Sequence, residues 1–346
     1  MLATLGNFLK NFLPRPGVQS VRDGASPRRP PLQPLGLDDF LNLDISPRQM
    51  LLSPILPERS LAMLYAPRGV GKTLLGLSIG LAVASGNALL RWSTPHPRRV
   101  LYVDGEMPLV SLQERLRAIS VELGRDIPND GFRILAADQT ENGINLGIEE
   151  GQSGLEPLLN DVDLLILDNL STLCTTGSES ASDAWVPMQN WLLMLRRRGI
   201  AVLFIHHAGT NGRQRGTSRR EDALDTVIAL RRPEDYSPEH GARFEIHFEK
   251  LRNRADGAGA VPFEASLESF TADGRDGIRW CSRDLIPPIL KRAAQLFAEG
   301  LTVREVAAIL RVSKSEAGRL RIQALDDGLL MPDEDCQLNN HQAMVQ

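Results

Sequence analysis

The sequence predicts an α/β fold, in which helices cover a mostly parallel sheet, followed by a small all-helical module. The alternation of short apolar runs with amphipathic runs, separated by glycine-rich turns, predicts the sheet. Two helix-capping signals close together near residue 300 predict the module. At 346 residues, the chain is long enough to hold both parts.

The order of the patterns predicts the direction of the strands. In the first part of the chain helices separate the strands, as parallel pairing requires. After residue 220 strand patterns occur alone, which predicts an antiparallel extension of the sheet. Strands are expected at 61–65, 99–103, 132–135, 163–168 and 200–206, and helices at 73–85, 108–123, 154–160 and 183–198. The antiparallel strands are expected at 223–231, 243–250 and 260–267.

Four segments are expected along the chain. They are an N-terminal arm and linker at 1–36, an α/β core at 37–283, a helical module at 284–332 and a tail at 333–346. Proline, arginine and serine dominate 14–36, a composition typical of linkers. Residues 1–13 carry an apolar helical stripe, which fits either a frayed amphipathic start or a helix that docks on a neighbouring subunit.

The composition limits the possible classes of protein. Acidic residues number 43 and basic residues 39, so the whole chain carries no electrostatic signature for nucleic acid or membrane. Three widely spaced cysteines argue against a disulfide framework or a zinc site. No run approaches a membrane span, and the N-terminus lacks the features of a signal peptide. A cytoplasmic protein is expected, with any nucleic-acid affinity confined to local patches.

A glycine-rich loop between a strand pattern and a helix pattern predicts a phosphate-binding site. Its backbone N–H groups would converge on the β- and γ-phosphates of ATP, and the next helix would point its positive end at them. The lysine would reach the phosphates, and the threonine hydroxyl would bind Mg²⁺. The loop consists of Ala66, Pro67, Arg68, Gly69, Val70, Gly71, Lys72 and Thr73, with Ala66 where the common motif has glycine.

Two carboxylates follow other predicted strands and would meet the loop at the carboxyl edge of the sheet. Asp168 ends the apolar run 164–168 and would hold the Mg²⁺ ion; its alternative role is to cap the strand end. Glu106 follows the strand that ends near residue 103 and would orient the attacking water; alternatively, it favours the start of the next helix.

Two histidines, His206 and His207, end the last predicted parallel strand. One of them could contact the γ-phosphate, because a neutral imidazole can change partners without the cost of burying a charge. Structural histidines are the alternative. A zinc site is disfavoured because adjacent side chains on a strand diverge.

Six motifs in this order resemble the RecA-fold ATPases of the RepA type, the hexameric replicative helicases of broad-host-range plasmids, and more distantly DnaB. They are APRGVGKT (66–73), VDGEMP (103–108), LLILDNL (164–170), LFIHHAG (203–209), RGTSRREDALDTV (215–227) and FEKLRN (248–253). The resemblance covers about residues 40–268. It implies a RecA-like core, a hexameric ring and hydrolysis of ATP, with Glu106 as the catalytic carboxylate and His207 as the likelier sensor. Lys250 and Arg252 would enter the ATP site of a neighbouring subunit, although a solvated strand end is the alternative.

The resemblance also implies that the loop 209–220 faces the channel of the ring and grips single-stranded DNA. Its arginines would neutralise phosphates and make the affinity depend on salt. A solvated surface loop is the alternative. The arginines are Arg213, Arg215, Arg219 and Arg220.

The C-terminal pattern predicts a helix-turn-helix unit with helices at 288–299, 303–310 and 314–324. Capping boxes beginning at Thr302 and Ser313 fix two of the helix starts. The third helix would present Lys314 and Arg319 outward, as in a DNA-recognition helix. Because such units also bind proteins, duplex DNA and a protein partner both stay open.

The leading hypothesis is an ATP-driven, ring-forming motor on single-stranded DNA, a RepA-type helicase. The alternative is a regulatory or loader ATPase that binds a DNA site and changes partners without unwinding. A recombinase or signalling ATPase of the same fold is a third possibility, although no aromatic polymerisation motif supports the recombinase.

Overall fold

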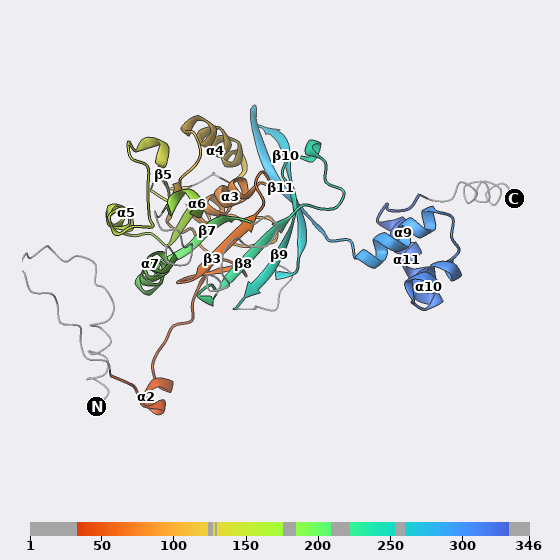
Figure 1. Cartoon of the computed structure of the whole chain (residues 1–346), viewed down its shortest axis with the longest axis horizontal. Coiled ribbons are helices and arrows are strands. Elements are labelled where there is room, and N and C mark those ends of the chain that lie inside the picture. Colours follow the sequence, from red (N-terminus) through yellow and green to blue (C-terminus); the bar gives the residue numbers. More distant parts are fainter. Residues whose placement is uncertain are drawn as a thin grey trace, which may run out of the picture. The chain divides into compact units, whose positions relative to one another are not determined.

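The computed structural model describes residues 33–123, 127–128, 130–175, 185–208, 222–252 and 260–331. The chain divides into two compact units at Ser282 and Arg283 (Figure 1). Most of the expected N-terminal arm and all of the expected C-terminal tail lie outside the described residues. Within those residues, no helix is both long and apolar enough to cross a membrane.

A nine-stranded sheet forms the first unit, with strand order β11-β10-β9-β8-β3-β7-β6-β4-β5. The parallel strands are β3 (Leu61–Ala66), β4 (Val100–Asp104), β5 (Phe132–Ala136), β6 (Leu164–Asp168), β7 (Ala201–His207) and β8 (Thr226–Arg231). The extension consists of β9 (Arg243–Leu251), β10 (Phe263–Ala272) and β11 (Arg275–Asp284). Its first two pairings, β8 with β9 and β9 with β10, are antiparallel.

The structure corrects two expectations about these strands. β8 pairs in parallel with β3, so the antiparallel extension begins one strand later than predicted. The sequence could not show this direction, because no helix pattern separates 201–207 from 226–231. β11 was not predicted, since most of its side chains are exposed or half-buried and the apolar alternation is faint.

Helices cover both faces of the sheet. They are α3 (Lys72–Ser85), α4 (Leu109–Leu123), α5 (Glu149–Leu155), α6 (Leu170–Leu173) and α7 (Trp185–Arg198), preceded by α2 (Leu37–Leu41) and a two-stranded ribbon of β1 (Met50–Leu52) and β2 (Leu56–Pro57). Short 3-10 turns occupy Ala137–Gln139, Glu156–Leu158 and Pro238–His240. The helix expected at 154–160 is therefore α5 followed by a 3-10 turn, because Pro157 has no N–H with which to continue an α-helix.

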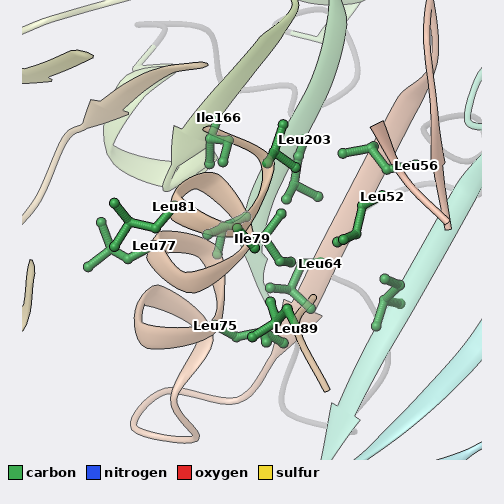
Figure 2. Close-up of a cluster of buried hydrophobic side chains, with 14 of the residues drawn as sticks. Leu52, Leu56, Leu64, Leu75, Leu77, Ile79, Leu81, Leu89, Ile166 and Leu203 are labelled. Carbon is green, nitrogen blue, oxygen red and sulfur yellow. The ribbon is translucent and has the colours of Figure 1, made fainter. Parts of the chain in front are cut away.

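The apolar core lies on the two faces of the sheet because side chains alternate along each strand. In β3, Ala62 and Leu64 pack on the face covered by α3, while Met63 and Tyr65 pack with the helix α7. Figure 2 shows Leu64 and Leu203 of the sheet beside Ile79 of α3.

Two glycines let α3 approach the sheet closely. A Cβ atom at Gly76 would lie 2.5 Å from Ile205 Cδ1, and one at Gly80 would lie 2.7 Å from Phe132 Cε2. On the side of the extension, Trp280 Nε1 of β11 donates a hydrogen bond to Ser78 Oγ in the middle of α3 (2.8 Å). The helix that follows the phosphate-binding loop is thus held from both sides.

The second unit is a three-helix module of α9 (Pro288–Ala298), α10 (Val303–Leu310) and α11 (Lys314–Asp326). Thr302 and Glu305 form the complete predicted capping box. At Ser313 only the serine half of the predicted box is present, with Oγ accepting a hydrogen bond from Glu316 N (3.1 Å). Ala293, Leu296, Val306 and Ala317 form its small core.

Candidate functional site

A pocket of about 490 Å³ lies at the carboxyl edge of the parallel strands. The β3–α3 loop, the ends of β4, β6 and β7, and the β8–β9 loop all contribute to it. Its lining residues are Arg68, Gly69, Gly71, Lys72, Thr73, Leu74, Asp104, Glu106, Met107, Pro108, Arg115, Asp168, Asn169, His207, Gly241 and Ala242. The pocket thus collects Lys72, Thr73, Glu106, Asp168 and His207 from separate parts of the chain.

The β3–α3 loop has the backbone of a phosphate cradle. Gly69 and Gly71 have φ angles of 74° and 118°, which side-chain-bearing residues rarely adopt. A Cβ atom at Gly71 would also lie 3.1 Å from Phe244 Cε1. Ala66 is the buried last residue of β3, so an alanine Cβ is tolerated where the common motif has glycine.

Lys72 is buried at the floor of the loop. Its Nζ donates hydrogen bonds to the carbonyl oxygens of Ala66 (3.0 Å) and Pro67 (2.8 Å). Burial lowers the Lys72 pKa to about 8, although Asp168 and Glu106 favour the charged form. An anionic phosphate in the pocket would add to their effect and raise this pKa again.

Asp168, the last residue of β6, lines the pocket. It accepts hydrogen bonds from the Tyr102 hydroxyl (2.7 Å) and from the Thr73 side chain. Burial raises the Asp168 pKa, and these two hydrogen bonds oppose the rise. A hydroxyl and a carboxylate in contact are oxygen ligands of the kind that Mg²⁺ prefers, so Thr73 and Asp168 fit a magnesium ion bound together with ATP.

Glu106 extends into the pocket from the β4–α4 turn. Its carboxylate accepts a hydrogen bond from Asn169 Nδ2, and its Oε2 lies 3.8 Å from His207 Nε2. The end of β4 also contributes Asp104, which is 1% exposed and whose pKa burial raises to about 6.

The two histidines separate as expected for adjacent residues on a strand. His207 lines the pocket, whereas His206 is buried at 4% exposure and is not among the lining residues. Burial and the positive charge of Lys72 lower the His207 pKa, which favours the neutral ring. The structure therefore brings His207, and not His206, to the pocket.

Lys250 and Arg252 lie far from this pocket. Leu251 pairs with Thr226, which in turn pairs with Ala62 near the start of β3. Arg252 N donates to Asp225 O (2.9 Å), and its guanidinium donates to Asp222 O. Both candidate finger residues thus lie toward the amino edge of the sheet, at the opposite end of the strands from the phosphate loop.

The candidate DNA contacts fall outside the pocket. The four arginines of the loop 209–220 are outside the described residues. Lys314 and Arg319 are exposed on α11 of the second unit.

Several contributors to the pocket were not predicted from the sequence. Asn169 orients Glu106, Tyr102 bonds to Asp168, and Arg232 Nη2 donates to Gly69 O (3.0 Å). Aspartate side chains often accept hydrogen bonds from the backbone amides two and three residues later in a turn. The role of Asp104 could therefore have been predicted from the sequence. The roles of Tyr102 and Arg232 could not, because each acts through a contact between distant segments.

Fold and pocket together define a P-loop ATPase with a RecA-like core. Residues 26–213, more than half of the chain, match the family model described as AAA domain, and the chain belongs to that family. A similar solved structure is the flagellar accessory protein FlaH from Methanocaldococcus jannaschii. It is 9% identical, with 66% of this chain and 91% of that chain covered and a TM-score of 0.46.

Proposed function

We propose that this protein is an ATP-hydrolysing motor of the RepA type, which assembles into a ring and acts on single-stranded DNA. Lys72 would bind the β- and γ-phosphates, and Thr73 and Asp168 would hold Mg²⁺. Glu106 would orient and deprotonate the attacking water. His207, close to Glu106, would contact the γ-phosphate as the sensor of the nucleotide state.

The position of Arg252 carries the proposal of a ring. Across the sheet, Arg252 lies level with Leu61, the first residue of β3. Ala66, the last residue of β3, is five residues further along that strand, next to the phosphate-binding loop. Five residues of strand span about 17 Å, several ångströms more than an arginine side chain can bridge. If Arg252 supplies positive charge to the transferred phosphoryl group, it must do so in the pocket of a neighbouring subunit.

The ring is tested by mixing two inactive variants. Lys72→Ala removes the phosphate contact of its own pocket but leaves Arg252, and Arg252→Ala does the reverse. Each variant alone is expected to lose ATPase activity by about 10³-fold or more. Their mixture should regain part of the activity, since a Lys72→Ala subunit can complete the pocket of an Arg252→Ala neighbour.

Arg279→Ala serves as the matched control, because Arg279 is an exposed arginine of the same sheet and pairs with Glu268 (3.3 Å). It should behave as wild type. Failure of the mixture to regain activity, or a single-chain mass at every protein concentration with ATP present, would contradict the ring. ATPase activity that single-stranded DNA does not stimulate would contradict the DNA motor.

The helical module supports the alternative, a regulatory or loader ATPase that binds a DNA site. Lys314, Ser315 and Arg319 are exposed on α11, while Ala317 and Ala324 are buried. A recognition helix needs such a polar outer face. Strand-displacement and footprinting assays separate the two functions: a motor unwinds a forked duplex, whereas a regulator protects one site without unwinding.

A further inference from the structure

Asp104 makes a local hydrogen-bonding pattern that holds the turn between β4 and α4. Its Oδ1 accepts hydrogen bonds from the backbone amides of Glu106 (3.1 Å) and Met107 (2.6 Å). The carboxylate thus closes the turn over the two residues that follow Gly105. The peptide that bears the Glu106 side chain is fixed by a buried group of the sheet.

The opposite side of the same turn is clamped against α6. Gly105 N donates to Asp168 O (2.7 Å), which joins the ends of β4 and β6. A Cβ atom at Gly105 would lie 2.6 Å from Thr172 Oγ1 and 2.8 Å from Leu173 Cδ2. Since no side chain fits there, the turn cannot move toward α6 without displacing that helix.

The Glu106 carboxylate is held at its far end by Asn169. Asn169 Oδ1 accepts hydrogen bonds from Ser171 N (3.0 Å) and Thr172 N (3.2 Å), so its NH₂ group must face Glu106. The Glu106 side chain is nevertheless 56% exposed, and an exposed glutamate on a free loop would sample many rotamers. Its direction therefore depends on the turn and on Asn169.

We propose that Asp104 is a positioning residue, which holds the Glu106 peptide in the turn from which the carboxylate reaches the water that attacks ATP. The proposal rests on the proposed hydrolysis of ATP with Glu106 as the base. A base must lie within hydrogen-bonding distance of the proton that it removes, so loosening this turn slows the chemical step.

The second oxygen of Asp104 supports a role beyond stability. Oδ2 is buried and has no hydrogen-bond partner among the described residues. A buried carboxylate with one unpartnered oxygen is costly, and an amide at this position could still accept both backbone bonds through its oxygen. The turn uses Oδ1 as its acceptor, and the variants below separate the effect of this acceptor from that of the charge.

The test compares Asp104→Ala with Asp104→Asn in the full chain. Asp104→Ala should lower kcat by about 10- to 100-fold while the KM for Mg–ATP stays within about twofold of wild type. Asp104→Asn should restore most of kcat. Amide hydrogen exchange of peptides that cover 104–108 should accelerate in Asp104→Ala and stay near wild type in Asp104→Asn.

Two further variants serve as controls. Asp138→Ala removes the carboxylate that accepts a hydrogen bond from Leu109 N (3.1 Å) at the start of α4, outside the pocket, and should keep the wild-type kcat. Glu106→Gln should lose hydrolysis but keep the slow exchange of the turn.

Wild-type kcat in Asp104→Ala, an equal loss in Asp104→Asn, or unchanged exchange in Asp104→Ala would each overturn the positioning role. A wild-type chain that binds but does not hydrolyse ATP would overturn the proposed function instead. In that case, the exchange measurement still decides whether Asp104 holds the turn.

Discussion

Burial of Asp104 predicts that a single change of charge will stabilise this protein at neutral pH. The carboxylate is 1% exposed, and burial raises its pKa from 3.8 to about 6 against the opposing effect of two backbone amides. The folded state therefore keeps the Asp104 proton to a higher pH than the unfolded state does. This contribution to the free energy of unfolding is largest below about pH 4 and is lost as the pH rises to about 6.

The size of the effect follows from the shift. About two pKa units at 1.4 kcal/mol each correspond to a cost of about 3 kcal/mol at pH 7, as an upper value. Asp104→Asn removes the charge and keeps an oxygen for the amides of Glu106 and Met107. We expect it to raise the free energy of unfolding by about 1 to 3 kcal/mol at pH 7.5, with the gain vanishing near pH 4.

Urea unfolding followed by circular dichroism measures the difference between wild type and variant at several pH values. Asp138→Asn, which replaces an exposed carboxylate, serves as the matched control for the substitution. An Asp104→Asn variant that is as stable as wild type at pH 7.5, or one whose gain is the same at pH 4, would refute the reasoning. The expected result would mean that the buried charge of Asp104 lowers the stability of the folded chain at neutral pH, while Oδ1 alone suffices to hold the turn.

Three further changes test other parts of the structure. Gly71→Ala should destabilise the first unit by about 1 to 3 kcal/mol in urea unfolding and weaken ATP binding, because φ is 118° and Phe244 lies 3.1 Å from the new Cβ. Gly143 also has a positive φ, but its surroundings are open, so Gly143→Ala should cost less in the same assay. Leu64→Ala, in the fully buried core under α3, should cost about 2 to 5 kcal/mol in the same assay. Thr302→Ala removes the capping box of α10 and should lower the stability of the helical module by about 1 kcal/mol, measured by its own thermal transition.

The parts of the fold that depend on local patterns were predictable from the sequence. The apolar strand pattern, the glycine-rich motif that ends in Lys72 and Thr73, and the helix pattern follow one another in the chain. Together they predicted β3, the phosphate-binding loop and α3. The parallel pairing of β8 with β3 was not predictable. It depends on the path of the chain from the end of β7, at the carboxyl edge of the sheet, to the start of β8 at the amino edge. For the same reason, the sequence could not show that Arg252 lies at the other end of the sheet from Lys72.

The pocket residues that the motifs predicted come from different segments of the chain, and the sequence did not predict which of them touch one another. Glu106 was expected beside the phosphate loop, but its hydrogen bond to Asn169 requires β4 and β6 to be neighbours with Asp104 opposite Asp168. The register of a sheet, which tertiary packing sets, determines such contacts.

The hydrogen bond from Trp280 to Ser78 gives the protein an internal optical probe of its nucleotide-binding helix. Ser78 Oγ also bonds to Leu74 O (2.8 Å), in the first turn after the phosphate loop, and the indole ring lies 5.3 Å from the ring of Phe244. The emission of an indole responds to its hydrogen bond and to the polarity around it. Trp92, Trp185 and Trp191 are buried in the sheet core, at 1%, 6% and 4% exposure. Subtracting the spectrum of Trp280→Phe from that of wild type would therefore isolate the emission of an indole that is hydrogen-bonded to α3, so that movement of this helix on nucleotide binding could be followed without any added label.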